Sequence, residues 1–241
     1  MARQERAIRT RQKILVAAAE LFDEVGYEAA TISEVLKRSG LTKGALYFHF
    51  TSKEELAQAV LAGQVGALPP VPEPDLFLQQ SLDEALVLAH LLYKGDPMVR
   101  GSVRLTVDQG SPIDGLDRRI PMQGWNNHNT AVLARAKESG ELLPHVDIEA
   151  TAKMFTGSFT GVQVLSKIMT GHADMVERVT DLMRTLLTAI AMPGVLVRLD
   201  FAPDRAERVY EAAVRLRDEK AAAAQAAQAA QAAAEAAGEA A

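Results

Sequence analysis

Apolar residues recur along most of the chain at the three- and four-residue spacing of amphipathic helices. Strand-type alternation is almost absent, and the short segment LVRLDF near residue 196 is the single candidate. The pattern therefore predicts an all-α fold. The longer helices are predicted over residues 6–26, 78–93, 98–107, 122–139, 148–169 and 175–192, with a last helix after Asp204. Ser81 and Glu84 have the spacing of a capping box and are expected to open the 78–93 helix.

Two short helices with a tight turn between them are predicted over residues 31–48. Thr31 and Glu34 have capping-box spacing, Gly40 permits the turn, and the second helix runs from Thr42 to Phe48. Apolar residues on the inner sides would hold the pair at a steep angle, as in a helix-turn-helix. An ordinary αα-hairpin with a solvated outer face has the same spacing, so the pattern alone leaves both interpretations open.

Composition shifts divide the chain into three parts. Four prolines in GALPPVPEP (66–74) exclude a helix through that segment. We predict an N-terminal domain over 1–52 that holds the short-helix pair, a larger helical domain over 53–220, and an Ala-rich tail over 221–241. The tail holds 15 Ala, 3 Gln, 2 Glu and 1 Gly, so it has nothing large to bury and is expected to be a fraying helix or disordered.

Charge is distributed unevenly along the chain. Residues 1–13 carry five basic side chains and one acidic, whereas residues 56–241 carry 17 basic and 23 acidic ones, within a net charge of −5. A basic arm before an acidic body is typical of a chain whose one end meets a polyanion, although a solvated terminus has the same composition. With the short-helix pair, the arm favours binding to double-stranded DNA.

The outer face of the 42–48 helix supplies side chains suited to DNA. Lys43 can donate to guanine or to phosphate, and Tyr47 and His49 can donate to phosphate oxygens. Gly44 and Ala45 are small enough for the backbone to approach base edges, and Thr42 would aim a helix N-terminus at the DNA backbone. Further phosphate contacts are expected from three residues outside this helix, which are Arg3, Thr31 and Lys53.

The stretch GYEAATISEVLKRSGLTKGALYFHFTSKEEL closely resembles the DNA-binding domain of the TetR family of transcriptional repressors. The resemblance covers residues 6–62 most strongly. It implies that residues 1–52 are a helix-turn-helix DNA-binding domain and that residues 53–220 are a helical ligand-binding and dimerisation domain. It implies that residues 42–48 form a recognition helix in the major groove, that Lys43 reads a base, and that Tyr47 and His49 anchor to the DNA backbone. It also implies a homodimer on a pseudo-palindromic operator, paired through the helices over 147–170 and 174–192. The apolar residues expected at that interface are Leu165, Ile168, Met169, Leu182, Leu186, Leu187 and Ile190.

Three runs in the second domain resemble the γ-butyrolactone receptors within that family. They are GSVRLTVDQGSP (101–112), the sole tryptophan Trp125 after RRIPMQG, and FTGSFTGVQVLSKIMTG (155–171). The resemblance implies a small neutral lactone or butenolide signal, with Trp125 as a flat wall of the pocket. The hydroxyl of Thr160 is expected to donate to the signal's carbonyl, with Gln64 and Thr106 as further polar contacts. The alkyl channel is expected to be lined by Leu86, Leu88 and Val162.

Several classes of protein fit the sequence poorly. The absence of cysteine excludes thiolate metal sites and disulfide scaffolds, and the five histidines are scattered without ligand spacing. No nucleotide-binding or hydrolase motif is present, so we expect no enzyme, metal or cofactor. No apolar run is long enough for a membrane span and no signal-peptide pattern begins the chain, so we expect a cytoplasmic, nucleoid-associated protein. The alternatives left open are an orphan regulator with an antibiotic ligand or none, a helical enzyme or carrier, and an architectural DNA-binding protein without a ligand.

Overall fold

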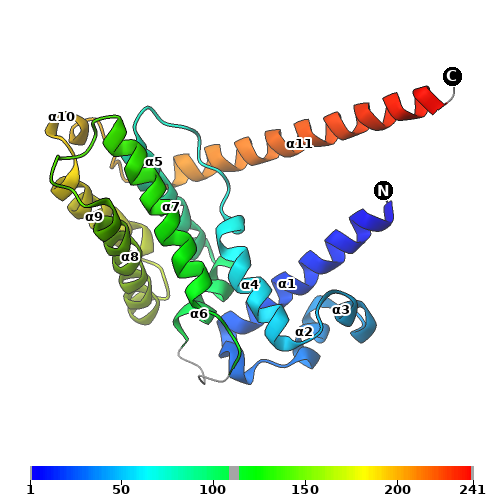
Figure 1. Cartoon of the computed structure of the whole chain (residues 1–241). Coiled ribbons are helices and arrows are strands. Elements are labelled where there is room, and N and C mark those ends of the chain that lie inside the picture. Colours follow the sequence, from blue (N-terminus) through cyan, green and yellow to red (C-terminus); the bar gives the residue numbers. More distant parts are fainter. Residues whose placement is uncertain (1, 109–113, 240–241) are drawn as a thin grey trace.

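The chain folds into helices throughout the part that the structure, a computed structural model, describes. Those residues are 2–108 and 114–239, with only the backbone described for 2–5, 64–67 and 228–239. No strand occurs in them, which confirms the predicted all-α class (Figure 1). The helices are α1 (Ala2–Ala29), α2 (Ile32–Ser39), α3 (Lys43–His49), α4 (Lys53–Ala67), α5 (Phe77–Lys94), α6 (Pro97–Val107), α7 (Arg119–Glu138), α8 (Ile148–Thr170), α9 (Met175–Ile190), α10 (Pro193–Leu196) and α11 (Arg205–Glu239). None of them is long and apolar enough to cross a bilayer.

Helices α1–α4 form the part that we name the head. Its core is built around the buried side chains of Phe22, Leu46, Phe50 and Leu56. The first half of α4 contributes several residues to this core, so the head packs as one unit beyond residue 52, the boundary expected from the sequence. Helix α1 begins at Ala2 rather than near residue 6, so the basic N-terminal segment is helical.

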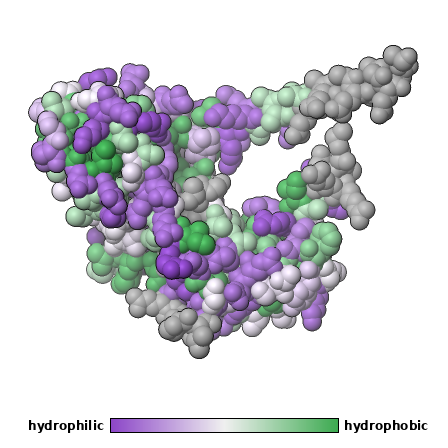
Figure 2. All heavy atoms as spheres, in the orientation of Figure 1, coloured by the Kyte–Doolittle hydropathy of each residue, from purple (hydrophilic) through white to green (hydrophobic). Residues whose placement is uncertain are grey.

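Helices α5–α11 form the second part, which we name the body. Helix α5 is buried on almost all sides and packs against α7, α9 and α11 (Figure 1). A helix that is covered on every side belongs in the centre of a domain, and the body core is accordingly built around it. Figure 2 shows the same view with hydrophilic and hydrophobic side chains mixed over the visible face.

The first turn of α5 is completed by a residue far away in sequence. The carboxylate of Glu141 accepts hydrogen bonds from the backbone N–H groups of Phe77 and Leu78, at 2.9 and 2.8 Å. A carboxylate at this position satisfies two of the four unpaired donors at a helix start and complements the helix dipole. The predicted Ser81–Glu84 capping box is wrong, because both residues lie inside the helix.

The head and body meet where α6 crosses α1. The backbone of Ala19 in α1 lies so close to Gly101 in α6 that a β-carbon on Gly101 would overlap the Ala19 carbonyl group. Leu105, one turn further along α6, is completely buried in the head core. Helix α6 therefore follows α5 of the body in sequence but packs into the core of the head. Only a glycine separates its backbone from that of α1.

Residues 68–76 connect α4 to α5 without a helix, as the prolines predict, although α4 itself continues to Ala67. The strand proposed near residue 196 is wrong. The segment begins at the end of the short helix α10, and the isolated bridge between Leu142 and Ala191 is the only β-type pairing in the described residues. Pro193 at the first position of α10 favours helix up to Leu196, and residues 197–201 then form a turn and an irregular stretch without a pairing partner strand in the described residues.

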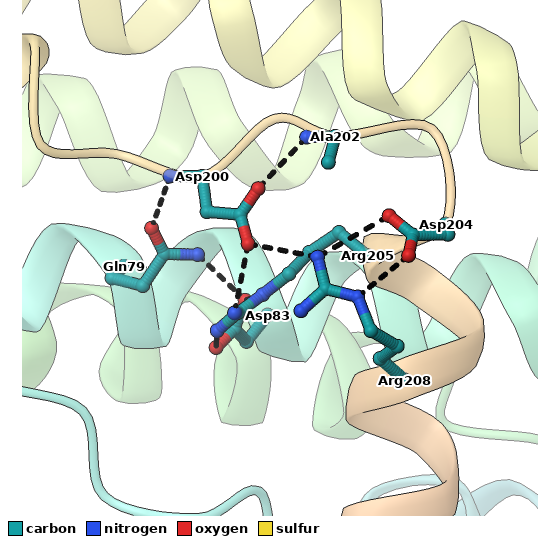
Figure 3. Close-up of polar contacts among 7 residues, drawn as sticks. All are labelled: Gln79, Asp83, Asp200, Ala202, Asp204, Arg205 and Arg208. Carbon is teal, nitrogen blue, oxygen red and sulfur yellow. Dashed lines mark hydrogen bonds and ion pairs between the residues drawn. The ribbon is translucent and has the colours of Figure 1, made fainter.

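A network of charged groups holds the start of α11 against α5 (Figure 3). Asp83 is 2% exposed at its side chain, and its carboxylate accepts from the Arg205 Nε at 2.9 Å. Asp200 accepts from Arg205 and Arg208 at 3.1 and 2.9 Å, and its backbone N–H donates to Gln79. Beyond this anchor α11 projects away from the body into the Ala-rich residues (Figure 1).

The closeness of α1 and α6 makes Gly101→Ala a costly substitution. The added methyl group must push the two helices apart, so we expect the free energy of unfolding to fall by about 1–3 kcal/mol, more than the gain in helix propensity returns. Urea denaturation followed by circular dichroism measures this. Gly194→Ala is the control, because a β-carbon at Gly194 meets no atom within 4 Å and should leave stability nearly unchanged.

The buried end of the Figure 3 network predicts a second stability effect. Asp83→Ala leaves Arg205 without its buried partner, so we expect a loss of about 3–5 kcal/mol in the free energy of unfolding. Asp204→Ala removes an exposed member of the same network, with 62% side-chain exposure, and should cost about 1 kcal/mol or less. Equal losses for the two variants would contradict the assignment of Asp83 as the anchor.

Candidate functional site

Helices α2 and α3 form the predicted helix-turn-helix. The Thr31 hydroxyl accepts from the Glu34 backbone N–H at 3.2 Å, and the Glu34 carboxylate binds Thr31 in return, which confirms the expected capping box. Gly40 ends α2 in the left-handed conformation, with φ of 67°, which a residue with a β-carbon adopts at a cost. Thr42 then starts α3 by accepting from the Ala45 backbone N–H at 3.2 Å.

The outer face of α3 is exposed as the sequence predicts. Thr42, Lys43 and Gly44 are exposed, and a β-carbon at Gly44 would meet nothing within 4 Å. The Lys43 ammonium lies 5.8 Å from the centre of the Tyr47 ring, and the Tyr47 side chain is 43% exposed. Ala45 is half-buried behind them. The helix thus presents a cation, a phenol and bare backbone on one face.

Phe48 is a surface residue that the sequence analysis missed. Its side chain is 77% exposed, and its ring meets His49 edge-on at 5.0 Å. Leu46 and Phe50 take the buried places at this end of α3, whereas Phe48 faces outward. His49 is half-buried beside it. An exposed aromatic ring at the end of α3 adds an apolar contact surface to the polar face.

Two of the expected phosphate contacts have other partners in the structure. The Lys53 ammonium donates to the carbonyl oxygens of Tyr27, Glu28 and Ala30, at 2.8, 3.4 and 3.0 Å, so all three of its protons are used at the end of α1. This correction removes Lys53 from the DNA-facing set. The Thr31 hydroxyl is likewise occupied by Glu34, to which it donates at 2.7 Å. The side chain of Arg3 lies outside the described residues.

The N-terminal turns of α1 carry the rest of the basic segment. The side chains of Arg6, Arg9 and Lys13 are exposed, and the Arg11 guanidinium stacks 5.0 Å above the Phe50 ring at the end of α3. This stacking ties the basic segment to the recognition pair. The positive charges of α1 and of α3 are therefore presented by one packed unit.

The body contains a small cavity between α5, α7 and α8. Its volume is about 60 Å³, which holds roughly four waters. Its apolar walls include Leu88, Met122, Trp125, Phe155 and Phe159. Trp125 is half-buried and packs against the body core.

The structure brings together three of the predicted ligand contacts and separates the others. Leu88, Trp125 and Thr160 line the cavity. Leu86 is on the other side of α5 in the core, and Val162 also packs into the core instead of facing the cavity. The hydroxyl of Thr106 donates to the Ser102 carbonyl at 2.8 Å, away from the cavity. The side chain of Gln64 lies outside the described residues.

The Thr160 hydroxyl is oriented differently from the expectation. It donates to the Thr156 carbonyl at 2.8 Å, so its proton is used within α8. The oxygen's free lone pairs can accept from a ligand hydroxyl, but no proton is left to donate to a carbonyl oxygen. The predicted donation from Thr160 is therefore corrected to acceptance.

Polar groups that the sequence analysis did not select lie at one side of the cavity. Glu84 lines it, and its carboxylate lies 2.6 Å from the His128 Nε2. This hydrogen bond raises the pKa of His128 above its ordinary value, against the opposing effect of burial. Asn129 donates to Thr156 at 3.2 Å, and Gln163 is 4% exposed. The sequence signal that could have identified this face of α5 is the helical spacing of Ser81, Glu84, Ala85 and Leu88.

The described residues contain no cluster of three or more side chains able to hold a metal ion. The cavity thus offers an apolar wall, one aromatic face and a few hydrogen-bonding groups. Such a lining suits a small organic molecule with limited polarity. Nothing about it resembles a nucleophile with a paired base.

Comparisons with known proteins agree with this geometry. The model of the family described as bacterial regulatory proteins, tetR family, matches residues 14–60. The A-factor receptor protein of Streptomyces griseus is 37% identical over 227 residues, covering 93% of this chain and 80% of that protein. This chain belongs to the TetR family. It is a TetR-type transcriptional repressor, and its relatives are DNA-binding regulators rather than enzymes.

Two solved structures place the chain within the TetR family more closely. TylP, a TetR regulator from Streptomyces fradiae, has a TM-score of 0.83 and 62% identity, covering 86% of this chain and 99% of TylP. A γ-butyrolactone receptor described as ArpA-like has a TM-score of 0.59 and 27% identity, covering 89% of this chain and 98% of that receptor. The resemblance to the TetR family and to its butyrolactone-receptor members is therefore confirmed.

Lys43 and Lys53 should behave in opposite ways when truncated. Lys43→Ala removes an exposed cation, so we expect at least tenfold weaker operator binding at low salt with the melting temperature nearly unchanged. Lys53→Ala removes the donor that pairs three carbonyl groups at the end of α1, so the melting temperature should fall clearly. Gel retardation and thermal denaturation of both variants test the pair. A collapse of folding in Lys43→Ala would assign that residue to structure instead.

Proposed function

We propose that this protein is a ligand-responsive repressor that binds a pseudo-palindromic operator as a dimer and is released by a small γ-butyrolactone or butenolide-type signal. The observation that supports this best is the cavity lined by Trp125, whose wall includes α5, α7 and α8. Helix α6, which packs against α5, reaches into the head. An operator-binding protein of this kind works on the chromosome, in the cytoplasm.

On the DNA, α3 is the helix that enters the major groove. Lys43 reads a base edge, while Tyr47 and His49 donate to phosphate oxygens. Thr42 presents the N-terminus of α3, and Gly44 and Ala45 allow its backbone close to the bases. Exposed arginines of α1 add contacts that depend on salt but not on base sequence.

A second copy of the chain is needed, because one head reads too few base pairs for useful specificity. Helix α8 carries an exposed apolar face suited to such pairing, with Met154, Leu165, Ile168 and Met169 between 54% and 71% exposed. Leu187, which the sequence analysis also placed at the interface, is fully buried in the body core and is removed from the set. Leu182, Leu186 and Ile190 are half-buried.

The signal is a neutral molecule with a polar ring and an alkyl chain. The ring would lie on Trp125 and donate a hydroxyl proton to Thr160, while the chain runs past Leu88 and Phe159. The cavity of about 60 Å³ is too small for such a molecule in this state, so binding has to move side chains of α5, α7 or α8. The ligand therefore binds more tightly to a conformer in which this cavity is wider.

Release follows from the tight contact between body and head. Widening of the body displaces α6, and α6 moves α1 because no side chain separates Gly101 from Ala19. The two heads of the dimer then no longer match the major-groove spacing. A shift from 99% competent to 1% competent requires a ligand preference of about 5.5 kcal/mol between the two conformers. Burial of a ring and an alkyl chain with one or two hydrogen bonds is of that order.

The test uses the single tryptophan as a reporter. An operator selected from genomic fragments should be retarded by the protein and released by γ-butyrolactones, with a change in Trp125 fluorescence over the same concentration range. Trp125→Leu should keep operator binding and need at least tenfold more signal for release. Tyr93→Leu alters an exposed aromatic residue of α5 outside the cavity and should leave the response unchanged.

Other outcomes would overturn parts of the proposal. Retardation without release by any lactone or butenolide would favour the orphan regulator, whose ligand is an antibiotic or absent. Constant Trp125 fluorescence with every small molecule would favour an architectural DNA-binding protein. The absence of sequence-selective retardation would contradict operator binding itself.

A further inference from the structure

A second cavity lies at the junction of head and body, separate from the one beneath Trp125. It has a volume of about 170 Å³ and is bounded by α1, α6 and α8. Gln163 is the one residue that lines both cavities. The proposed function uses none of the charged residues of this second cavity, which is the larger of the two.

The lining of this junction cavity carries an excess of positive charge. Arg100, Arg104 and Lys167 line it together with a single carboxylate, that of Asp23. The Lys167 ammonium lies 3.0 Å from the Asp23 carboxylate, which links α8 of the body to α1 of the head across 144 residues. The nearest carboxylate to Arg104 is that of Asp108, 3.9 Å away. The three cations are therefore only partly neutralised by the described residues.

His172 is a buried polar group without a partner in this cavity. His172 is 2% exposed, and neither ring nitrogen makes a hydrogen bond of normal geometry among the described residues, although the Gln163 backbone carbonyl lies close enough to the ring to raise its pKa slightly. A buried imidazole left in this state costs stability. An occupant of the cavity that bonds to the ring would recover that cost.

The backbone of His172 adds a second, independent observation. It has a φ of 75°, the one positive φ outside glycine in the described residues. Glycine adopts this conformation more easily, and histidine is among the few other residues that are enriched in it.

The charge state of His172 follows from its surroundings. Burial lowers its pKa most, and the positive charges of Lys167 and Arg100 lower it further, against smaller opposing effects of Asp23 and the Gln163 backbone carbonyl. The ring is therefore neutral at pH 7 and offers one donor and one acceptor. Three cations and a neutral donor form a receptor for an anion rather than for a cation.

We propose that the junction cavity binds a small organic carboxylate that replaces Asp23 as the partner of Lys167. The carboxylate accepts hydrogen bonds from Lys167, Arg100 and His172. A short apolar stem packs on Val103, Val107 and Val164, which line the cavity together with the uncharged residues Ile168 and Gln163. These valines favour an organic acid over phosphate or chloride, since an inorganic anion would leave them without contacts.

Occupation of the site changes the link between head and body. The bound carboxylate competes with Asp23 for Lys167, so the ion pair between α8 and α1 opens when the site fills. This is a site for an acidic metabolite, whereas the cavity beneath Trp125 takes a neutral signal. The binding claim stands without DNA and does not depend on the proposed signal.

The test uses benzoate as the probe and benzamide as its uncharged counterpart, with the full-length chain and no DNA. The ring signals of His172, assigned with His172→Asn, are followed by NMR during titration, and affinity is measured by calorimetry. We expect benzoate to shift the His172 signals and benzamide to bind at least tenfold more weakly. Lys167→Gln should weaken benzoate binding at least tenfold.

Two further variants keep the test decisive. Lys153→Gln removes another lysine of α8 with an ion-pair partner, Glu149, and should leave benzoate binding unchanged. His172→Asn suits the left-handed backbone and should fold while losing benzoate affinity, which covers the case in which Lys167→Gln is unstable. Thermal denaturation checks that both variants fold.

Four results would overturn the proposal. One is equal binding of benzoate and benzamide, and another is unchanged affinity in both Lys167→Gln and His172→Asn. The third is equal competition by inorganic phosphate, which would reveal a general anion site without use of the valines. The fourth is a perturbation of Trp125 in place of His172, which would show that benzoate enters the other cavity. None of these outcomes bears on operator binding, which is measured separately.

Discussion

The contact between Gly101 and Ala19 is the constraint on which the arrangement of this protein depends. It brings the backbones of α6 and α1 together with no room for a β-carbon between them, so the two helices pack directly against each other. Because Leu105 of the same helix is buried in the head core, α6 acts as part of both units. The recognition pair is thus held by the body without a flexible linker.

Around this contact the polar groups divide into two kinds. Lys53, Glu141 and the pair of Asp83 and Arg205 join segments distant in sequence, and each is placed where a helix begins or ends. The residues on the outer face of α3 and in the junction cavity instead have groups that the fold leaves unused. Lys43 and His172 are the clearest examples. A group that folding leaves unpaired is available for recognition.

Local features of the fold could be predicted from the sequence, because they depend on neighbouring residues. The capping box at Thr31, the Gly40 turn and the helix periods are of this kind. Glu141 could not be placed at the start of α5, since 64 residues separate it from Phe77.

The ligand cavity was only partly predictable for a related reason. Helical spacing does not say which face of a buried helix lines a cavity, so Leu86 and Leu88 were chosen together although they point to different sides of α5. The partnership of Glu84 with His128 joins two helices and has no local signal, although Glu84 itself falls on the same stripe as Leu88. The junction cavity brings together residues from three helices, so the residue spacing within any single helix could not predict it.

The cap that Glu141 provides for α5 has a consequence for the order of folding. The first turn of this central helix lacks a local side-chain cap and takes its cap from the α7–α8 connection, so the stability of that turn depends on a contact that spans 64 residues. The short helices of the head instead carry their own local caps at Thr31 and Thr42. A ribosome-bound chain that has emerged only as far as α6 would carry a formed head with an unfinished body, and it could meet DNA before it could sense anything.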